Sequence, residues 1–278
     1  MKKLIIYLGG LCYLLNFSAC SHHYYAPNEA MMLQLDKKND LKVAASVGNA
    51  ENDYYNLQAG YSPFKHVAVA GNFFKVQAGE NMNFPQKTHG FAAEGAIGTY
   101  YLFELNPTKE RQFLGSTIRS KKRTILFDLY TGYSTGKVNT YYEKGGQARL
   151  YFQKNYIQAG IHFKAKIISF SYAFKREKLR YSQIDALLPI SDRDILIMEG
   201  LVRNRFNVHT HNWRLTGNIN YAQLYFGFSS IVSPPYVKID LDNGFGESYS
   251  EPFMHNGNIH VGVLLDINLI YKNFKKNN

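Results

Sequence analysis

Apolar and polar residues alternate along most of this chain, and that alternation restricts the fold more than any other feature. Every second residue from Ile259 to Leu269 is aliphatic, and Ile157, Ala159, Ile161 and Phe163 repeat the pattern. A period of two places successive side chains on opposite faces of an extended strand. The sequence therefore predicts strands with one apolar face and one polar or small face.

The alternation and the turn residues between its runs predict ten strands in one domain. Only the segment 182–200, in a long connection, has a helical pattern. The predicted fold is all-β: an antiparallel up-and-down transmembrane β-barrel of about ten strands, within a range of 8–12. The predicted strands cover residues 41–49, 54–62, 66–76, 89–104, 123–138, 148–164, 166–181, 207–220, 222–233 and 257–271.

Three features favour a membrane barrel over a soluble one. Many predicted strands are longer than the roughly 5–6 residues usual in soluble sheets. Aromatic residues, 15% of the chain, gather toward strand ends, as at Tyr54 and Tyr55, at Tyr100 and Tyr101, and at Tyr271. The non-apolar face carries small residues and isolated charges, which suits a polar lumen. A lipocalin-like soluble barrel that binds an apolar ligand remains the first alternative.

The N-terminus has the order of a bacterial export signal. Lys2 and Lys3 precede an apolar stretch over 4–15, and Phe17-Ser18-Ala19 leads to Cys20. We interpret 1–19 as a signal peptide and Cys20 as a lipidated first residue, because small residues before a cysteine form a lipobox. The segment 20–40 is expected to be a lipid-anchored tether or a small plug in the barrel mouth, and 41–278 the β-barrel domain.

The chain resembles a known class of protein at four places: Cys20, the run Tyr25-Ala26-Pro27-Asn28, the strand opening Asp40-Leu41-Lys42, and the run 56–61, NLQAGY. These residues are similar to those of uncharacterised Gram-negative outer-membrane β-barrel lipoproteins. The resemblance implies a location in the outer membrane, both lipid-anchored and integral. It implies no known activity.

Polar residues on the predicted inner face are the candidate functional residues. They form an expected lumen network of Glu94, Asp128, His162, Arg214, Asn218 and Asp266. Buried charges must pair, so a structural network is one interpretation, and a constriction that binds an ion or small solute is the other. The triplet Gln-Ala-Gly recurs at 58–60, 77–79 and 158–160, with Gln and Gly predicted to face inward.

No catalytic residue, metal site or cofactor is predicted. His209 and His211 share a face but lack a third ligand, and Ser229, Ser230 and His255 belong to no recognisable catalytic motif. We therefore expect no enzyme. A barrel enzyme acting on lipid or peptide is the second alternative.

The charge balance predicts contact with lipid. The chain carries a formal charge of +11, with basic clusters at 121–123, 175–180 and 275–276. An exported protein seldom meets nucleic acid, whereas anionic head groups attract Lys and Arg near a membrane. The expected partners are outer-membrane lipid and a small solute, with no nucleic acid. The expected protein is a monomer with a structural or small-solute passage role.

Overall fold

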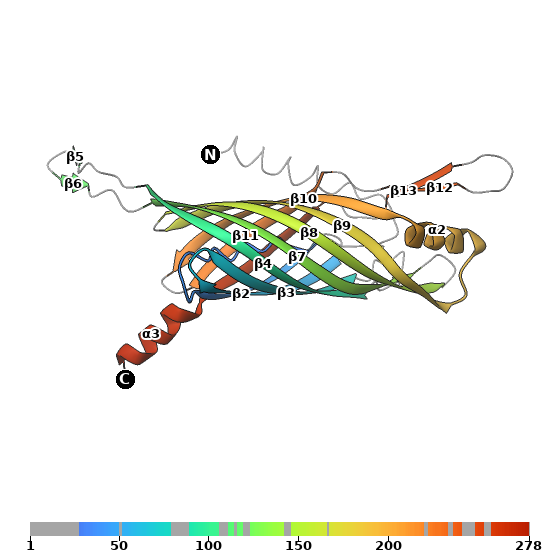
Figure 1. The fold of residues 1–278 in the computed structure, drawn as a ribbon, viewed down its shortest axis with the longest axis horizontal. Coiled ribbons are helices and arrows are strands. Elements are labelled where there is room, and N and C mark those ends of the chain that lie inside the picture. The colour runs from blue at the N-terminus through green and yellow to red at the C-terminus, as the bar shows by residue number, and fades with distance from the viewer. Residues whose placement is uncertain are drawn as a thin grey trace, which may run out of the picture.

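The chain folds into a closed barrel of ten antiparallel strands (Figure 1). The computed structural model describes residues 28–49, 52–78, 89–105, 111–113, 116–118, 123–141, 146–165, 167–219, 222–232, 236–240, 248–252 and 257–277. The barrel strands are β1 (Leu41–Asn49), β2 (Asn52–Phe64), β3 (Val67–Ala78), β4 (His89–Leu105), β7 (Arg123–Tyr141), β8 (Gln147–Lys164), β9 (Ile168–Leu188), β10 (Arg205–Ile219), β11 (Ala222–Ile231) and β14 (Gly257–Asp266).

Strands that follow one another in the chain are neighbours in the barrel, and β14 closes the barrel by pairing with β1. This up-and-down order confirms the predicted fold class and its ten strands. The strand centres agree with the sequence pattern because the inward and outward positions of each strand differ in polarity. Three strands exceed their predicted lengths by three residues or more: β9 continues to Leu188, β7 continues to Tyr141, and β2 covers Asn52–Phe64.

Two segments differ from their predicted structure. The strand predicted over 257–271 ends at Asp266, and helix α3 (Ile267–Asn277) follows. The Asp266 carboxylate accepts a hydrogen bond from the Leu269 backbone N–H at 3.0 Å, which caps the first turn of that helix. The predicted helical segment 182–200 begins as strand, and helix α2 (Asp192–Arg203) starts only after its N-cap, Ser191.

The two ends of the barrel differ. At one, here called the turn end, connections of two or three residues join β2 to β3, β8 to β9 and β10 to β11. The short strands β5 (Arg111–Phe113) and β6 (Ser116–Ile118) also lie on a connection at this end. At the other, the loop end, the connections carry α2 and the paired strands β12 (Tyr236–Asp240) and β13 (Ser248–Pro252) (Figure 1).

The outer surface of the barrel is apolar. Outward residues such as Leu57, Ile97, Ile157 and Leu215 are 51–59% exposed, whereas their inward neighbours Gln58 and Gln158 are buried. A water-soluble barrel has the reverse arrangement, so this distribution is that of a transmembrane barrel and not of the lipocalin-like alternative. The apolar belt, as we call this surface, includes Leu57, Phe73, Ile97, Leu129, Ile157, Phe170, Leu215, Phe226 and Val261.

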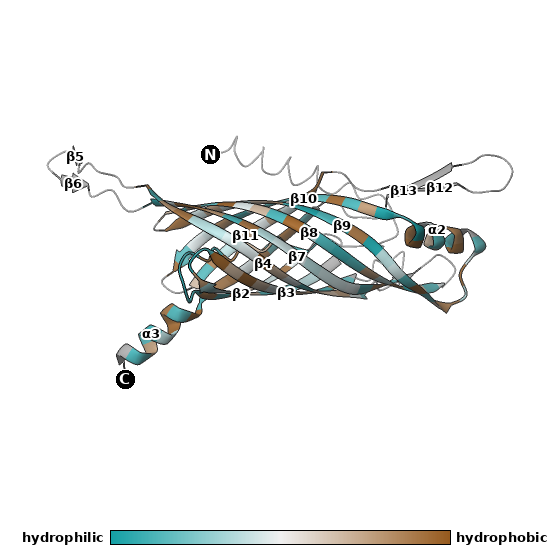
Figure 2. Cartoon of the chain, in the orientation of Figure 1, coloured by the Kyte–Doolittle hydropathy of each residue, from teal (hydrophilic) through white to brown (hydrophobic). Residues whose placement is uncertain are grey.

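The belt ends before the strands do. On β9, Phe170 and Phe174 are followed at the next outward positions by Arg176, Lys178 and Arg180. Figure 2 shows the corresponding hydrophilic stretches of β9 and β10 near α2. The longest strands therefore project beyond the lipid-facing belt at the loop end.

Placing a charge in the belt should destabilise the barrel. Leu215 lies between Phe170 and Phe226 in the register of β9, β10 and β11. We expect Leu215→Arg to lower the free energy of unfolding by about 2–4 kcal/mol, the cost of an arginine near the bilayer midplane. Urea unfolding in phospholipid vesicles measures the change. Gln77→Arg, two residues beyond Lys75 at the loop end, is the control and should cost much less. Equal losses in both variants would contradict the assigned belt.

Candidate functional site

The N-terminal segment of the described chain lies inside the barrel. All residues from Asn28 to Leu35, here called the lumen segment, are at most 2% exposed. Asn28 contacts Lys154 and Lys175, which face inward close to the loop-end edge of the belt, and Gln34 contacts Lys42 at the start of β1. The segment thus runs from that edge toward the turn end. For residues 20–40 we expect either a tether or a small plug. The described residues of this range are arranged as a plug inside the barrel, and Cys20 lies outside the described residues.

Barrel side chains hold the backbone of the lumen segment. The Gln158 side chain accepts a hydrogen bond from the Met31 N–H at 2.9 Å and donates one to the Met31 carbonyl at 2.8 Å. Gln58 donates to the Ala30 carbonyl at 3.1 Å, and Asn212 accepts from the Ala30 N–H at 3.2 Å. An isolated extended segment has no neighbouring strand, so these amides replace the missing ladder.

Two of the three Gln-Ala-Gly repeats therefore have a clear structural role. Gln58 and Gln158 face inward as the alternation predicts, and both bind the lumen segment. Gln77 of the third repeat is in register with Asp53 and His89 and is partly exposed. It is an outward residue, because the buried residues of β3 alternate at Asn72, Phe74 and Val76 and Gln77 continues the outward series of Phe73 and Lys75.

Apolar residues of the lumen segment fill the turn end of the barrel. Leu33 and Leu35 belong to a buried cluster with inward residues of several strands: Ala44, Ala68, Tyr100, Leu126, Tyr130, Tyr225 and Leu264. Gly60 makes the close approach of Leu33 feasible, because a Cβ at Gly60 would lie 2.5 Å from a Leu33 methyl carbon. The side chains of the lumen segment are therefore packed against the barrel wall as closely as those of a protein core.

Glu29 sits in a pocket of donors on the barrel wall. Arg214 donates to its carboxylate at 3.1 Å, the Tyr54 hydroxyl donates at 3.1 Å, and the Ser46 hydroxyl donates as well. His260 Nε2 lies 3.5 Å from the same carboxylate. Arg214 also donates to the Met32 carbonyl at 2.8 Å. Because both charges are buried, each needs the other to offset its lost hydration.

Four further buried charges form a neutral cluster beside Asn28. Lys154 lies 2.7 Å from Glu94 and 2.8 Å from Glu177, while Lys175 lies 3.2 Å and 2.8 Å from the same two carboxylates. The Asn28 side-chain oxygen accepts from Lys154 at 2.6 Å and from Lys175 at 3.1 Å. This four-charge cluster has two positive and two negative members, so it needs no counterion.

The six residues predicted to form one lumen network fall into separate groups. Glu94 belongs to the four-charge cluster, Arg214 binds Glu29, and Asp128 pairs with His162 at 2.7 Å. Asn218 lies near the turn end, where it donates to the Ala165 carbonyl and to Ser169. Asp266 caps α3. The structure thus brings together only Asp128 and His162 of this set.

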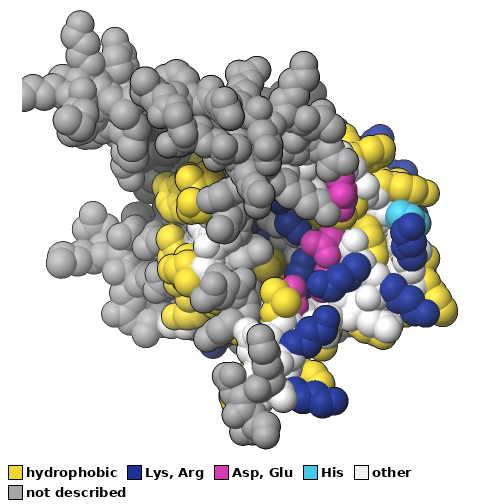
Figure 3. Space-filling model, turned by 90° about the vertical axis from the view of Figure 1, so that its left-hand side faces the viewer, with side chains coloured by type: hydrophobic (Ala, Val, Ile, Leu, Met, Phe, Trp, Pro, Cys, Tyr) yellow, Lys and Arg dark blue, Asp and Glu magenta, His cyan; other side chains and the backbone are white. Residues whose placement is uncertain are grey.

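Charged residues also gather at the turn end, where Figure 3 shows basic side chains with acidic ones between them. Asp36, which follows the lumen segment, lies 2.7 Å from Lys164 and 3.8 Å from Lys42. Burial alone would raise the pKa of the Asp36 carboxyl, but these two lysines outweigh it and lower that pKa to about 2. Asp40 lies 3.1 Å from Lys42. These ion pairs fix the chain where it turns into β1.

Sequence reasoning missed Glu29, Lys154, Lys175 and Glu177. The last three share the inward parity of Gln158 on β8 and Ser171 on β9, so the alternation contained a signal for them. Lys175 belongs to the basic run 175–180, for which contact with lipid is expected, and it is instead buried inside the barrel. Glu29 lies in a segment without a period, and nothing local marks it as a partner of Arg214.

The residues considered for catalysis do not converge. His209 and His211 face outward: His209 lies tilted against Phe174, and His211 stacks on Trp213. Ser229 instead faces the lumen and donates to Asn212 at 2.7 Å. His255 lies outside the described residues. Within the described ranges, no group of three or more His, Cys, Asp or Glu side chains is placed to hold a metal ion.

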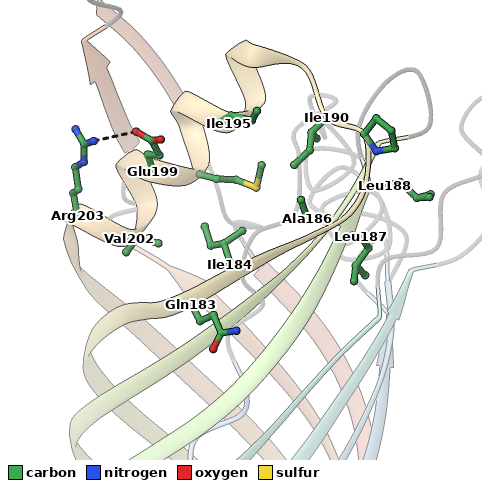
Figure 4. Close-up of a pocket in the computed structure, with 12 residues that line it drawn as sticks. Gln183, Ile184, Ala186, Leu187, Leu188, Ile190, Ile195, Glu199, Val202 and Arg203 are labelled. Atoms are coloured by element: carbon green, nitrogen blue, oxygen red, sulfur yellow. Dashed lines mark hydrogen bonds and ion pairs between the residues drawn. The ribbon is translucent and has the colours of Figure 1, made fainter.

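An apolar pocket of about 760 Å³ lies at the loop end, between the end of β9 and α2 (Figure 4). Ile184, Leu187, Ile195 and Val202 line it, and the Glu199–Arg203 ion pair borders it. On its other side α2 closes this end of the barrel, because Ile197, Met198 and Leu201 pack into the apolar cluster that includes Tyr181, Phe206 and Val208.

Removing Arg214 should test the coupling between wall and lumen segment. We expect Arg214→Leu to lower the free energy of unfolding by about 3–5 kcal/mol, because it leaves the Glu29 carboxylate buried without its cation. Adding Glu29→Gln should restore part of that loss. Arg205→Leu, an exposed arginine on the same strand, is the control. Urea unfolding in phosphatidylcholine vesicles measures all four proteins, and a loss in Arg214→Leu no greater than in Arg205→Leu would contradict this account.

Comparison with known proteins adds little to this geometry. No family model and no curated protein matches the chain. Among solved structures, the chain is similar to the translocator domain of the autotransporter NalP from Neisseria meningitidis, with 10% identity, a TM-score of 0.32 and 95% of each chain covered. At this level of similarity the neighbour does not inform the function of this chain.

Proposed function

We propose that the protein is an integral outer-membrane barrel whose resting lumen is closed by its own N-terminal segment. Its role is then structural, and a small solute passes only if the lumen segment leaves. The observation that carries this proposal is the complete burial of Asn28–Leu35, with their backbone bound by Gln58, Gln158 and Arg214.

The outer surface supports the membrane location. A continuous apolar belt with a polar interior needs lipid around it, and closed barrels of this kind cross outer membranes. None of the helices in the described part of the chain is long and apolar enough to cross a membrane. Three of the four connections at the turn end have two or three residues, whereas four of the five at the loop end are longer. This difference supports an orientation with the turn end in the periplasm and the loop end at the cell exterior.

The contents of the lumen argue against steady conduction. A barrel of ten strands encloses little space beyond its own side chains. Here the lumen segment occupies that space, from Asn28 at the four-charge cluster to the apolar cluster around Leu33 and Leu35. The charged residues expected to line a constriction are engaged with protein partners: Asp128 with His162, and Arg214 with Glu29.

Conductance distinguishes a closed barrel from a passage. In planar bilayers we expect the full chain to show no steady ion current and a variant lacking residues 28–35 to conduct, because the deletion empties the centre of the lumen. The control lacks residues 80–87, of the same number, in the connection between β3 and β4. Steady current through the unaltered protein would support passage and contradict the closed resting state. Heat-dependent gel mobility shows whether each variant has folded.

The proposal includes a lipid anchor on Cys20. The lumen segment runs from the loop-end edge of the belt to the turn end, so the residues before Asn28 would join it from the loop end. Seven residues lie between Cys20 and Asn28, and the eight steps from Cys20 to Asn28 span about 26–29 Å when the chain is extended. That length would allow an anchor in the leaflet at the loop end, the outer leaflet in this orientation.

Metabolic labelling tests this anchor. Radiolabelled palmitate should label the full chain and Cys12→Ser, whose altered residue leaves with the signal peptide, but not Cys20→Ser. An epitope tag inserted after Ser21 should then bind antibody on intact cells. Label retained in Cys20→Ser would rule out lipidation at this residue. A tag detected only after the cells are opened would place the anchor in the inner leaflet.

A further inference from the structure

The outward face of β9 and β10 carries a compact group of cations at the loop end. Arg176, Lys178 and Arg180 occupy successive outward positions of β9, and Arg205 lies directly opposite Arg180 on β10. All four side chains are exposed. We call these four residues the basic patch.

The charges of the basic patch are not compensated within the described chain. Like charges directly opposite each other on paired strands are destabilising, as for Arg180 and Arg205. No ion pair joins any of the four to a carboxylate among the described residues. Their cross-strand neighbours on β8 include Gln153 and Asn155, which are neutral. A barrel wall arranged in this way is suited to an anionic ligand.

The location of the patch identifies the region of the membrane that would supply the ligand. Arg176 follows Phe174 at the next outward position of β9, so the patch begins where the apolar belt ends. Beside this boundary, Phe174 packs against His209, and Trp213 stacks on His211 and Phe228. Aromatic side chains in this position are typical of the interface between acyl chains and head groups.

The length of the basic patch along β9 favours one class of lipid over another. Arg176 and Arg180 are four residues apart, or about 13–14 Å along the strand. A glycerophospholipid presents one phosphate at one depth. A glycolipid with a phosphorylated disaccharide head presents phosphates at separate positions, and arginine binds phosphate through two parallel hydrogen bonds.

We propose that the basic patch binds the phosphorylated head group of an outer-leaflet glycolipid. This inference rests on the proposed outer-membrane location, with the loop end outside. It narrows the expected contact with anionic lipid to three residues of β9 and one of β10. Lys175, which belongs to the same basic run of the sequence, takes no part, because it is buried in the four-charge cluster.

The test measures lipid binding by the full-length, detergent-solubilised protein. Native mass spectrometry during titration with diphosphoryl lipid A should show bound lipid on the unaltered chain. In the variant Arg176→Gln/Arg180→Gln/Arg205→Gln the apparent affinity should fall about tenfold or more. The matched control removes three exposed cations of the turn end, by Lys38→Gln/Lys65→Gln/Arg123→Gln, and should bind as the unaltered chain does.

Three outcomes would overturn the assignment. One is equal affinity in both triple variants, and another is undiminished binding of a lipid A that lacks its phosphates. The third is phosphatidylglycerol binding that is as tight as that of lipid A and is lost in the same variant, which would make the patch a general site for anionic phospholipid. Gel mobility before and after heating is recorded for every protein. A variant that keeps the heat-dependent shift is a folded barrel, so lost binding is then separate from any failure of the membrane barrel itself.

Discussion

A polar group inside a membrane barrel must find its partner within the protein, and this constraint determines how the lumen is built. The lumen segment has no adjacent strand, so its amides and carbonyls would be buried without partners if the wall were apolar. Gln58, Gln158, Asn212 and Arg214 supply the missing donors and acceptors from the inner face. The polar residues of the inner face are therefore explained by their hydrogen bonds to the lumen segment.

The same constraint makes wall and lumen segment mutually dependent. Arg214 is buried and charged, and its carboxylate partner, Glu29, comes from the segment and not from another strand. Withdrawing the segment would leave this guanidinium without its counter-charge. The four-charge cluster is different, because Glu94 and Glu177 neutralise Lys154 and Lys175 within the wall. Displacement of the segment would thus be opposed chiefly at Glu29, where the wall lacks an acid of its own among the groups in contact with Arg214.

The barrel could be predicted from the sequence because alternation is a local property that each strand displays by itself. Ten runs with period two gave ten strands, and Gln58 and Gln158 faced inward as expected. Pairings between side chains were harder to predict, because they depend on the register between strands and on what occupies the lumen. Asp128 and His162 meet on adjacent strands, whereas Arg214 meets Glu29 from a segment without any period. The C-terminal alternation also misled, since Ile267, Ile270, Tyr271 and Phe274 fit a helical spacing equally well.

The distribution of charge differs between the two ends of the barrel, because some charges are paired within the chain and others are not. Charges that face inward are paired within the chain, as in the four-charge cluster. At the turn end Asp36 forms ion pairs with Lys42 and Lys164, and Asp40 forms one with Lys42. The outward cations of β9 and β10 have no such acids beside them in the described strands. Beyond the belt, the outward face of a strand has no acyl chains to contact, although its inward face still packs into the apolar cluster with α2. The proposed glycolipid contact would supply the anions that the outward cations lack within the chain.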